Sequence, residues 1–206
     1  MKNNPVPPFP NEAMASKRVL LASNSPRRRE LISMILPHFE VPRLLDIDED
    51  YPSDLKAEDV PAFLSEKKAK AYYGTLLQND VLITADTVVI LNDEILGKPK
   101  DEADAIAMLK QLSGEVHRVV TGVTVLWNCG ASIDTFSCTT KVKFSTLTDE
   151  QIRNYVRIYR PFDKAGAYGI QEWIGAVGIE YIEGSYYNVM GLPVKKLYDH
   201  LRKLIN

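Results

Sequence analysis

The segment SNSPRRR, at residues 23–29, puts three arginines in the first turn of an expected helix. A helix N-terminus already carries a partial positive charge, so each cation there is unfavourable by about 0.3 to 1 kcal/mol. A bound anion reverses that effect, and the backbone N–H groups, the hydroxyls of Ser23 and Ser25 and the guanidinium forks together suit a polyphosphate. The segment therefore predicts a phosphate site. The alternative is three solvated arginines beside a capping serine.

A single aspartate, Asp86, interrupts the apolar segment VLITADTVVIL at residues 81–91. This composition predicts a central strand buried on both faces, where an ionised carboxylate is costly unless it is paired or binds a metal. Thr84 and Thr87 add hydroxyls, and a divalent cation would stabilise the carboxylate and polarise a phosphate oxygen and a bound water. Asp86 is therefore a candidate catalytic residue and metal ligand. The alternative is a structural aspartate, hydrogen-bonded at a bend or an end of the strand.

Two lysines and an acidic segment are weaker candidates for the same site. Lys98 follows the aspartate-bearing strand in a loop, and Lys68 lies on the helix expected before that strand. A lysine is a good point-charge partner for terminal phosphates, although a single lysine is more often a solvated surface group. The acidic segment at residues 46–50 offers a second metal ligand, for which Glu49 is our candidate, and hydration of the whole segment is the alternative.

The elements that must position these residues follow from local signals. Ser25 as N-cap and Pro26 at the first helical position predict a helix that ends by Pro37, after a short buried strand at residues 18–22. Apolar residues at helical spacing predict two more helices, at residues 59–77 and 102–112. Between these two helices come the strand that holds the aspartate and the loop NDEILGKPKD.

The second half of the chain predicts a hairpin and then more helices. Residues 116–127 and 135–144 alternate as two antiparallel strands, with the lysines of the second strand facing water. The capping-box spacing of Thr148 and Gln151 predicts a helix that ends at Pro161, and Pro193 starts a terminal helix. The glycine-rich segment before Pro193 predicts short strands and turns.

The composition limits the class of protein. With 206 residues, 45% of them apolar, the chain can bury a sizeable core, either as one α/β body with a cleft or as two small domains. We expect one two-lobed domain at residues 17–206. A net charge of -2 gives no general positive field for a nucleic-acid backbone or an anionic membrane. We therefore expect neither partner.

The cysteines and the N-terminus indicate location. Cys129 and Cys138 show no metal-ligand spacing, so we expect free thiols in a reducing compartment, and a cytoplasmic protein. No segment has the apolar length of a membrane-spanning helix. Residues 1–16 are rich in proline without an apolar core, so we expect a disordered tail and not a signal peptide.

Several familiar catalytic motifs are missing from the sequence. It contains no GxxxxGK[ST] loop, GxGxxG fingerprint, GxSxG elbow or HExxH helix. His38, His117 and His200 are too far apart in the sequence to indicate a site. These absences argue against P-loop kinases, dehydrogenases and α/β-hydrolases.

Five segments together resemble the Maf family of nucleotide pyrophosphatases, in order and with family-like spacing. They are LASNSPRRRELI (21–32), LSEKKAKAY (64–72), ITADTVVILNDEILGKP (83–99), DKAGAYGIQ (163–171) and GSYYNVMGLP (184–193). The resemblance implies a mixed α/β fold like that of inosine triphosphate pyrophosphatases, with a mixed sheet, flanking helices and a deep cleft between two lobes. It also implies that a homodimer is a common assembly.

The resemblance implies roles for individual residues. Its SxSPRR element makes Ser23, Arg27 and Arg28 phosphate-side residues, and its ADT element makes Asp86 the proton acceptor. The lysines of its EKKA and GKP elements are Lys68 and Lys98. The acidic position of the family's first long loop corresponds to Glu49.

The resemblance also bears on the nucleobase. In the subclass that prefers dTTP and UTP, the discriminating residues correspond here to Arg27, Thr87 and Gln171. A glutamine amide carries one acceptor and two donors, which suffices to pair with the imide edge of uracil or thymine. Without the resemblance, Gln171 would be only a polar residue in a glycine-rich turn.

These observations predict hydrolysis of dTTP and UTP to the monophosphate and pyrophosphate, which would also remove non-canonical nucleotides. Water attacks the α-phosphorus, Asp86 orients or deprotonates it, and Asp86 and Glu49 hold Mg²⁺ or Mn²⁺. The predicted cations are Arg27, Arg28, Lys68 and Lys98, which neutralise the triphosphate. One alternative is another base, such as 7-methyl-GTP or a modified pyrimidine nucleotide. A second alternative is a nucleotide-binding regulator of septum formation without important catalysis.

Overall fold

The computed structural model describes residue 14 and residues 16–204. Within this part of the chain, a mixed six-stranded sheet has the order β1-β2-β4-β5-β6, and β3 pairs with β2 beside β1. Only β1 runs parallel to its neighbour, and the other pairs are antiparallel. The strands are β1 (Arg18–Leu21), β2 (Asp80–Leu91), β3 (Glu94–Leu96), β4 (Val116–Trp127), β5 (Ser132–Phe144) and β6 (Ile179–Glu183). The mixed sheet and its helices confirm the expected α/β fold class.

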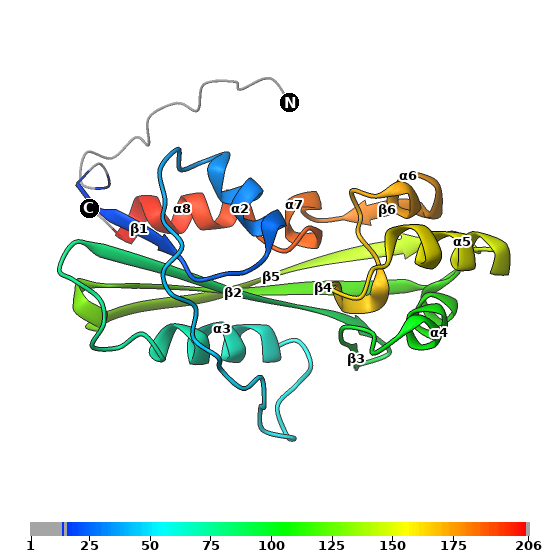
Figure 1. Cartoon of the computed structure of the whole chain (residues 1–206), viewed down its shortest axis with the longest axis horizontal. Coiled ribbons are helices and arrows are strands. Elements are labelled where there is room, and N and C mark those ends of the chain that lie inside the picture. The colour runs from blue at the N-terminus through cyan, green and yellow to red at the C-terminus, as the bar shows by residue number, and fades with distance from the viewer. Residues whose placement is uncertain (1–13, 15, 205–206) are drawn as a thin grey trace.

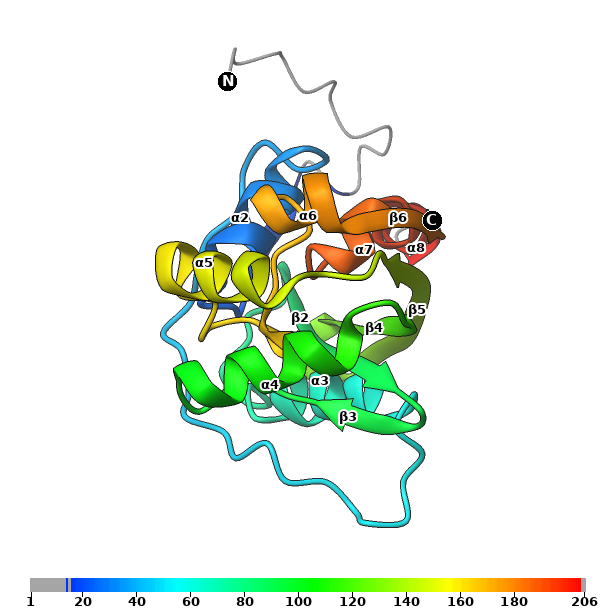
Figure 2. The ribbon, with the colours of Figure 1, turned by 90° about the vertical axis from the view of Figure 1, so that its right-hand side faces the viewer.

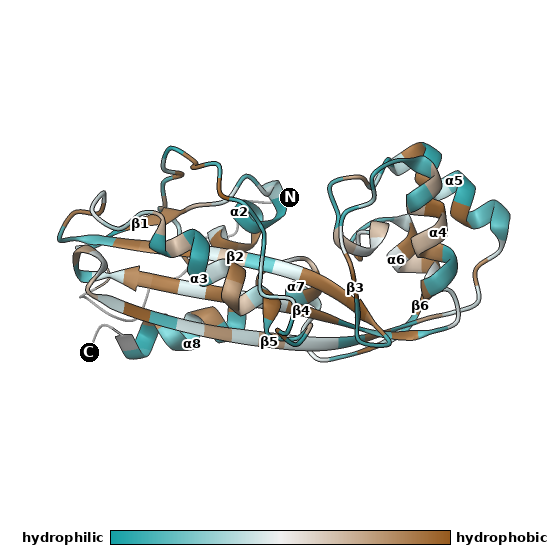
Figure 3. Cartoon of the chain, turned by 90° about the horizontal axis from the view of Figure 1, so that it is seen from below, coloured by the Kyte–Doolittle hydropathy of each residue, from teal (hydrophilic) through white to brown (hydrophobic). Residues whose placement is uncertain are grey.

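Helices cover both faces of this sheet. In Figure 1, α3 lies below the long strands, and α2, α7 and α8 lie above them. Figure 2 shows α4, α5 and α6 together at one end of the molecule, and Figure 3 shows the same group apart from α2 and α3. The α-helices are α2 (Pro26–Ser33), α3 (Val60–Lys70), α4 (Glu102–Leu112), α5 (Asp149–Tyr159), α6 (Trp173–Gly178), α7 (Tyr186–Val189) and α8 (Val194–Leu204), and two short 3-10 helices are η1 (Asn128–Gly130) and η2 (Ala165–Ala167).

The predicted helix starts at Ser25 and Thr148 are confirmed. The Ser25 hydroxyl accepts the backbone N–H of Arg28 at the start of α2, and Pro26 is its first residue. At α5, Thr148 and Gln151 form the predicted capping box, in which each side chain accepts a backbone N–H of the other. Local side-chain chemistry therefore decides where these helices begin.

Three predicted segments differ from the structure. Helix α3 ends at Lys70 and not near residue 77, because the chain turns through Gly74, whose φ of +79° is left-handed. The expected loop after β2 contains β3, because Asn92 and Asp93 both have positive φ and form a tight hairpin turn. The glycine-rich segment contains the short helices α6 and α7 as well as strand β6.

The core surrounds β2. All its side chains are buried except the half-buried Thr87, which confirms the predicted central strand. The largest apolar cluster fills the face toward α2 and α8 and also reaches α4 and α5, and two smaller clusters lie under α3. The predicted tail lies outside the described residues except for Ser16 and Met14, whose side chain packs in the largest cluster.

Two further expectations concern thiols and membranes. Cys129 and Cys138 are free thiols, as predicted. Among residues 14 and 16–204, the structure contains no helix with the length and apolar character needed to cross a membrane.

Candidate active site

The candidate site lies where one edge of β2 is left open. On this edge, β1 pairs with Asp80–Ile83 and β3 pairs with Val89–Leu91. Between them, no strand of the described chain covers residues 84–88 on that side. Since successive side chains of a strand point to opposite faces, an open edge lets both faces of β2 contribute to one cavity.

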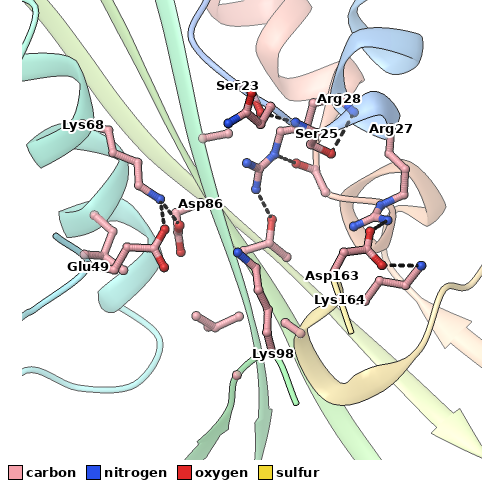
Figure 4. Close-up of a pocket in the computed structure, with 18 of the residues that line it drawn as sticks. Ser23, Ser25, Arg27, Arg28, Glu49, Lys68, Asp86, Lys98, Asp163 and Lys164 are labelled. Carbon is pink, nitrogen blue, oxygen red and sulfur yellow. Dashed lines mark hydrogen bonds and ion pairs between the residues drawn. The ribbon is translucent and has the colours of Figure 1, made fainter. Parts of the chain in front are cut away.

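A cavity of about 790 Å³ occupies this edge, a size within the range of small-molecule sites. Figure 4 shows charged side chains from several elements around it. All of the predicted site residues line it, namely Ser23, Arg27, Arg28, Glu49, Lys68, Asp86, Thr87, Lys98 and Gln171. The fold therefore brings together residues that span most of the sequence.

On the α3 face, Lys68 joins two carboxylates. Its Nζ lies 2.6 Å from Oδ1 of Asp86 and 2.7 Å from Oε1 of Glu49. The Asp86 side chain is only 12% exposed, so the ion pair answers the predicted need of a buried carboxylate for a partner. We call Asp86, Lys68 and Glu49 the acid side of the site.

A close approach of helix and sheet builds the acid side. Gly122 on β4 pairs with Asp86, and a Cβ at Gly122 would lie 2.2 Å from the backbone carbon of Pro61. Only glycine permits this contact, which presses the start of α3 against the sheet. Lys68 follows about two helical turns after Pro61 and so returns to the same face of α3, above Asp86.

The acid side fits a divalent cation that is shared with a phosphate. The Lys68 ammonium lowers the pKa of Glu49, which partial burial alone would raise, so this carboxylate is ionised at neutral pH. Magnesium takes one or two carboxylates and completes its shell with water and phosphate oxygens. Asp86 and Glu49 converge on one cation already, and residues 14 and 16–204 contain no cluster of three metal-binding side chains for an all-protein cage.

On the opposite face of β2, neutral groups hold Arg28. Its Nε donates to the carbonyl oxygen of Gly191 at 2.8 Å, and its Nη2 donates to Oγ1 of Thr87 at 2.9 Å. Burial lowers the pKa of Arg28, although Asp86 acts to raise it, so its charge is costly without an anion. The other nitrogen of the fork, Nη1, has no partner among the described residues. We call Arg27, Arg28 and Thr87 the arginine side of the site.

The two neighbouring arginines differ from Arg28. Arg27 lines the cavity and pairs with Asp163, with Nη1 2.8 Å from Oδ2. Arg29 points back along α2, where its Nε and Nη2 donate to the carbonyl oxygen of Ser23 at 3.3 and 3.2 Å. It does not line the cavity, so the predicted group of three arginines is reduced to two.

Two predicted residues line the cavity without a hydrogen-bond partner in the described chain. Lys98 follows Gly97, whose carbonyl oxygen accepts the N–H of Gly166 and so fixes the loop, and Figure 4 shows its side chain between the acid and arginine sides. Gln171 is exposed at the end of the loop after η2. Thr84, in contrast, donates to the carbonyl oxygen of Ser65 at 2.6 Å and is fully buried, so it takes no part.

Sequence reasoning missed Lys164. Its side chain lines the cavity, is only 9% exposed, and forms ion pairs with Asp163 at 2.7 Å and Glu172 at 3.1 Å. The charged residues in this otherwise apolar, glycine-rich segment were the available signal. Their mutual pairing depends on the fold of the loop and is not readable from spacing.

Comparison with known proteins supports one family. A family model described as Maf-like protein matches residues 18–204. A dTTP/UTP pyrophosphatase of Phocaeicola vulgatus is 50% identical over 94% of this chain and 99% of its own length. A dTTP/UTP pyrophosphatase of Porphyromonas gingivalis is 51% identical over 90% of this chain and 93% of its own.

A solved structure supports the fold. A HAM1 protein from Coxiella burnetii aligns with a TM-score of 0.52 at 13% identity, over 91% of this chain and 99% of that protein. At this identity the likeness concerns the fold alone.

Proposed function

This chain belongs to the Maf family, and from that membership we propose that it hydrolyses dTTP and UTP to the nucleoside monophosphate and pyrophosphate. One observation carries the proposal from the residues themselves. A single carboxylate in a central strand, Asp86, opens into a cavity of about 790 Å³ that also holds two arginines and three lysines. A polyanion that binds these cations brings its phosphorus atoms toward the carboxylate.

The reaction that this arrangement favours is attack of water on the α-phosphorus. Asp86 orients the water and accepts its proton, while the bond from the α-phosphorus to the bridging oxygen breaks and pyrophosphate leaves. Arg28 and Lys98 face the triphosphate and neutralise charge that moves onto the leaving group. Lys68, 2.6 Å from Asp86, fixes the direction of the carboxylate.

A divalent cation, Mg²⁺ or Mn²⁺, is the cofactor that we assign to Asp86 and Glu49. When bound, such an ion polarises phosphate oxygens and lowers the pKa of a bound water. Lys68 lies between the two carboxylates, so its ammonium group must either move away when the metal ion binds or share the carboxylate oxygens with it. The remaining ligands would be water and substrate phosphate, as magnesium commonly prefers.

The base preference is assigned to Arg27, Thr87 and Gln171. Gln171 has an unpaired amide at the cavity wall, which can donate to and accept from the imide edge of uracil or thymine. The hydroxyl of Thr87 is already engaged by Arg28 and lies 3.0 Å from Oγ1 of Thr121. We therefore assign its contribution to holding Arg28.

The test is pyrophosphate release measured across canonical and modified triphosphates, with Mg²⁺, with Mn²⁺ and after chelation with EDTA. We expect turnover to be fastest with dTTP and UTP, one pyrophosphate for each monophosphate, and loss of turnover with EDTA. Faster turnover of 7-methyl-GTP would replace the base assignment. Tight binding of triphosphates without turnover would support the nucleotide-binding regulator and contradict the enzyme.

A further inference from the structure

A buried polar cluster lies directly behind the loop that carries Gln171. Oε2 of Glu172 accepts a hydrogen bond from the Tyr155 hydroxyl. Oε1 of Glu172 forms an ion pair with Nζ of Lys164 at 3.1 Å. Tyr155 is 1% exposed, and the Lys164 side chain is 9% exposed. These three side chains come from α5, from the segment before η2 and from the residue before α6. The proposed reaction gives neither Tyr155 nor Glu172 a task.

The same cluster also forms hydrogen bonds with the backbone of the loop. The Tyr155 hydroxyl accepts the N–H of Gly169 at 3.0 Å, and the N–H of Glu172 donates to the carbonyl oxygen of Gly169 at 3.0 Å. A Cβ at Gly169 would lie 2.8 Å from the Glu172 carboxyl carbon, and one at Gly175 would lie 1.8 Å from the carbonyl oxygen of Ile170. Neither Gly169 nor Gly175 therefore has room for a side chain, so the backbone near Gln171 is closely packed at both positions.

The Tyr155 hydroxyl has a defined orientation. Burial, followed by its bond to Glu172, raises the pKa of Tyr155, so the hydroxyl stays protonated and has one hydrogen to donate. That hydrogen goes to Glu172, whose charge Lys164 balances. The oxygen is then left as the acceptor for Gly169. These two hydrogen bonds therefore set the direction of the Tyr155 hydroxyl.

We propose that Tyr155 and Glu172 are positioning residues for nucleobase selection, which hold the peptide that presents Gln171 to the base. This inference rests on the proposed function. A glutamine amide distinguishes an imide from an amino-pyrimidine edge only if its oxygen and nitrogen are held in register, and a site that is loose by about 1 Å loses that discrimination. Gln171 itself has no hydrogen bond in the described chain, so its backbone alone must supply this precision.

The main test removes one hydroxyl and compares two bases. Tyr155→Phe keeps the ring in the core and leaves the Gly169 N–H without an acceptor. We expect the preference for UTP over CTP, measured as kcat/KM, to fall by about 5- to 10-fold, mainly through a higher KM for UTP. Tyr159→Phe is the matched control, because Tyr159 stacks on Tyr155 in the same helix with ring centroids 5.1 Å apart and is 40% exposed. It should keep the wild-type preference.

A double mutant separates positioning from general damage. If Tyr155 acts through Gln171, Tyr155→Phe combined with Gln171→Ala should discriminate no worse than Gln171→Ala alone. Additive losses would overturn the proposal, as would an unchanged UTP to CTP ratio in Tyr155→Phe. A uniform loss of kcat for both bases would indicate a structural role and would also overturn it.

A second variant covers the case in which Tyr155→Phe does not fold. Glu172→Gln keeps the size of the side chain but loses the charge that pairs with Lys164, and it should also lower the UTP preference. An unchanged preference in this variant would overturn the proposal. Wild-type protein without turnover of either nucleotide would refute the proposed function and, with it, this inference. An active wild type with unaltered variants would refute the inference alone.

Discussion

The two faces of β2 hold their charges in different ways. On the acid side, charges neutralise one another, since Lys68 bridges Asp86 and Glu49. On the arginine side, Arg28 is held by a carbonyl and a hydroxyl, so its full charge remains. Arg27 on this side is paired with Asp163, but Arg28 is already placed for an anion, whereas the acid side must rearrange when a cation joins it. The difference predicts that the enzyme depends on the arginine side for binding the triphosphate and on the acid side for chemistry.

Asp86→Asn should produce the largest effect, because it removes the proton acceptor and leaves the arginine side intact. We expect kcat for dTTP to fall by about 10²- to 10⁴-fold. Binding of a non-hydrolysable triphosphate analogue should persist, as measured by calorimetry, and the circular dichroism spectrum should not change. Asp93→Asn, in the exposed turn after β2, is the matched control. Near-normal turnover in Asp86→Asn would refute the assigned role.

Arg28→Lys should produce a smaller loss, by removing the planar fork that reaches Gly191, Thr87 and the triphosphate together. A lysine keeps the charge but not this geometry. We expect kcat/KM to fall by about 10- to 100-fold, to a similar extent for UTP and dTTP. Arg29→Lys serves as control, because the hydrogen bonds of the Arg29 side chain within the described residues go to the carbonyl oxygen of Ser23 and not to the cavity. Equal losses in both variants would contradict the distinction between the two arginines.

Glu49→Gln should have the smallest effect, because Glu49 is 55% exposed and shares its task with Asp86. We expect about a 10-fold loss of activity at limiting Mg²⁺, with partial recovery at high Mg²⁺. Since Lys68 lowers the pKa of Glu49, the carboxyl group is already ionised at every pH above the ordinary pKa of a glutamate. The substitution should therefore leave the pH profile between about pH 6 and 8 unchanged. Asp48→Asn, on the same loop but paired with Lys67, is the control.

The sequence predicted the elements that depend on local chemistry. The capped helix starts at Ser25 and Thr148 and the apolar strand around Asp86 follow from neighbouring residues alone. The prediction failed where the backbone conformation of a few residues determines an element, as in the turn at Asn92 and Asp93 that creates β3. A strand of three residues has no periodicity to detect.

Asp86 and the arginines at the start of α2 were also visible in the sequence, because a carboxylate in a buried strand and cations at a helix start are locally unfavourable. The role of Gln171 came from the family resemblance alone. The arrangement of these residues was not visible in the sequence. Asp86 and Thr87 are adjacent and point to opposite faces, and only the gap between β1 and β3 lets both line one cavity. Likewise, the contact of Gly122 with Pro61 brings Lys68 to Asp86, and the pairing of Glu172 with Tyr155 fixes the loop of Gln171. Such contacts join distant residues, so packing decided them and local propensity did not.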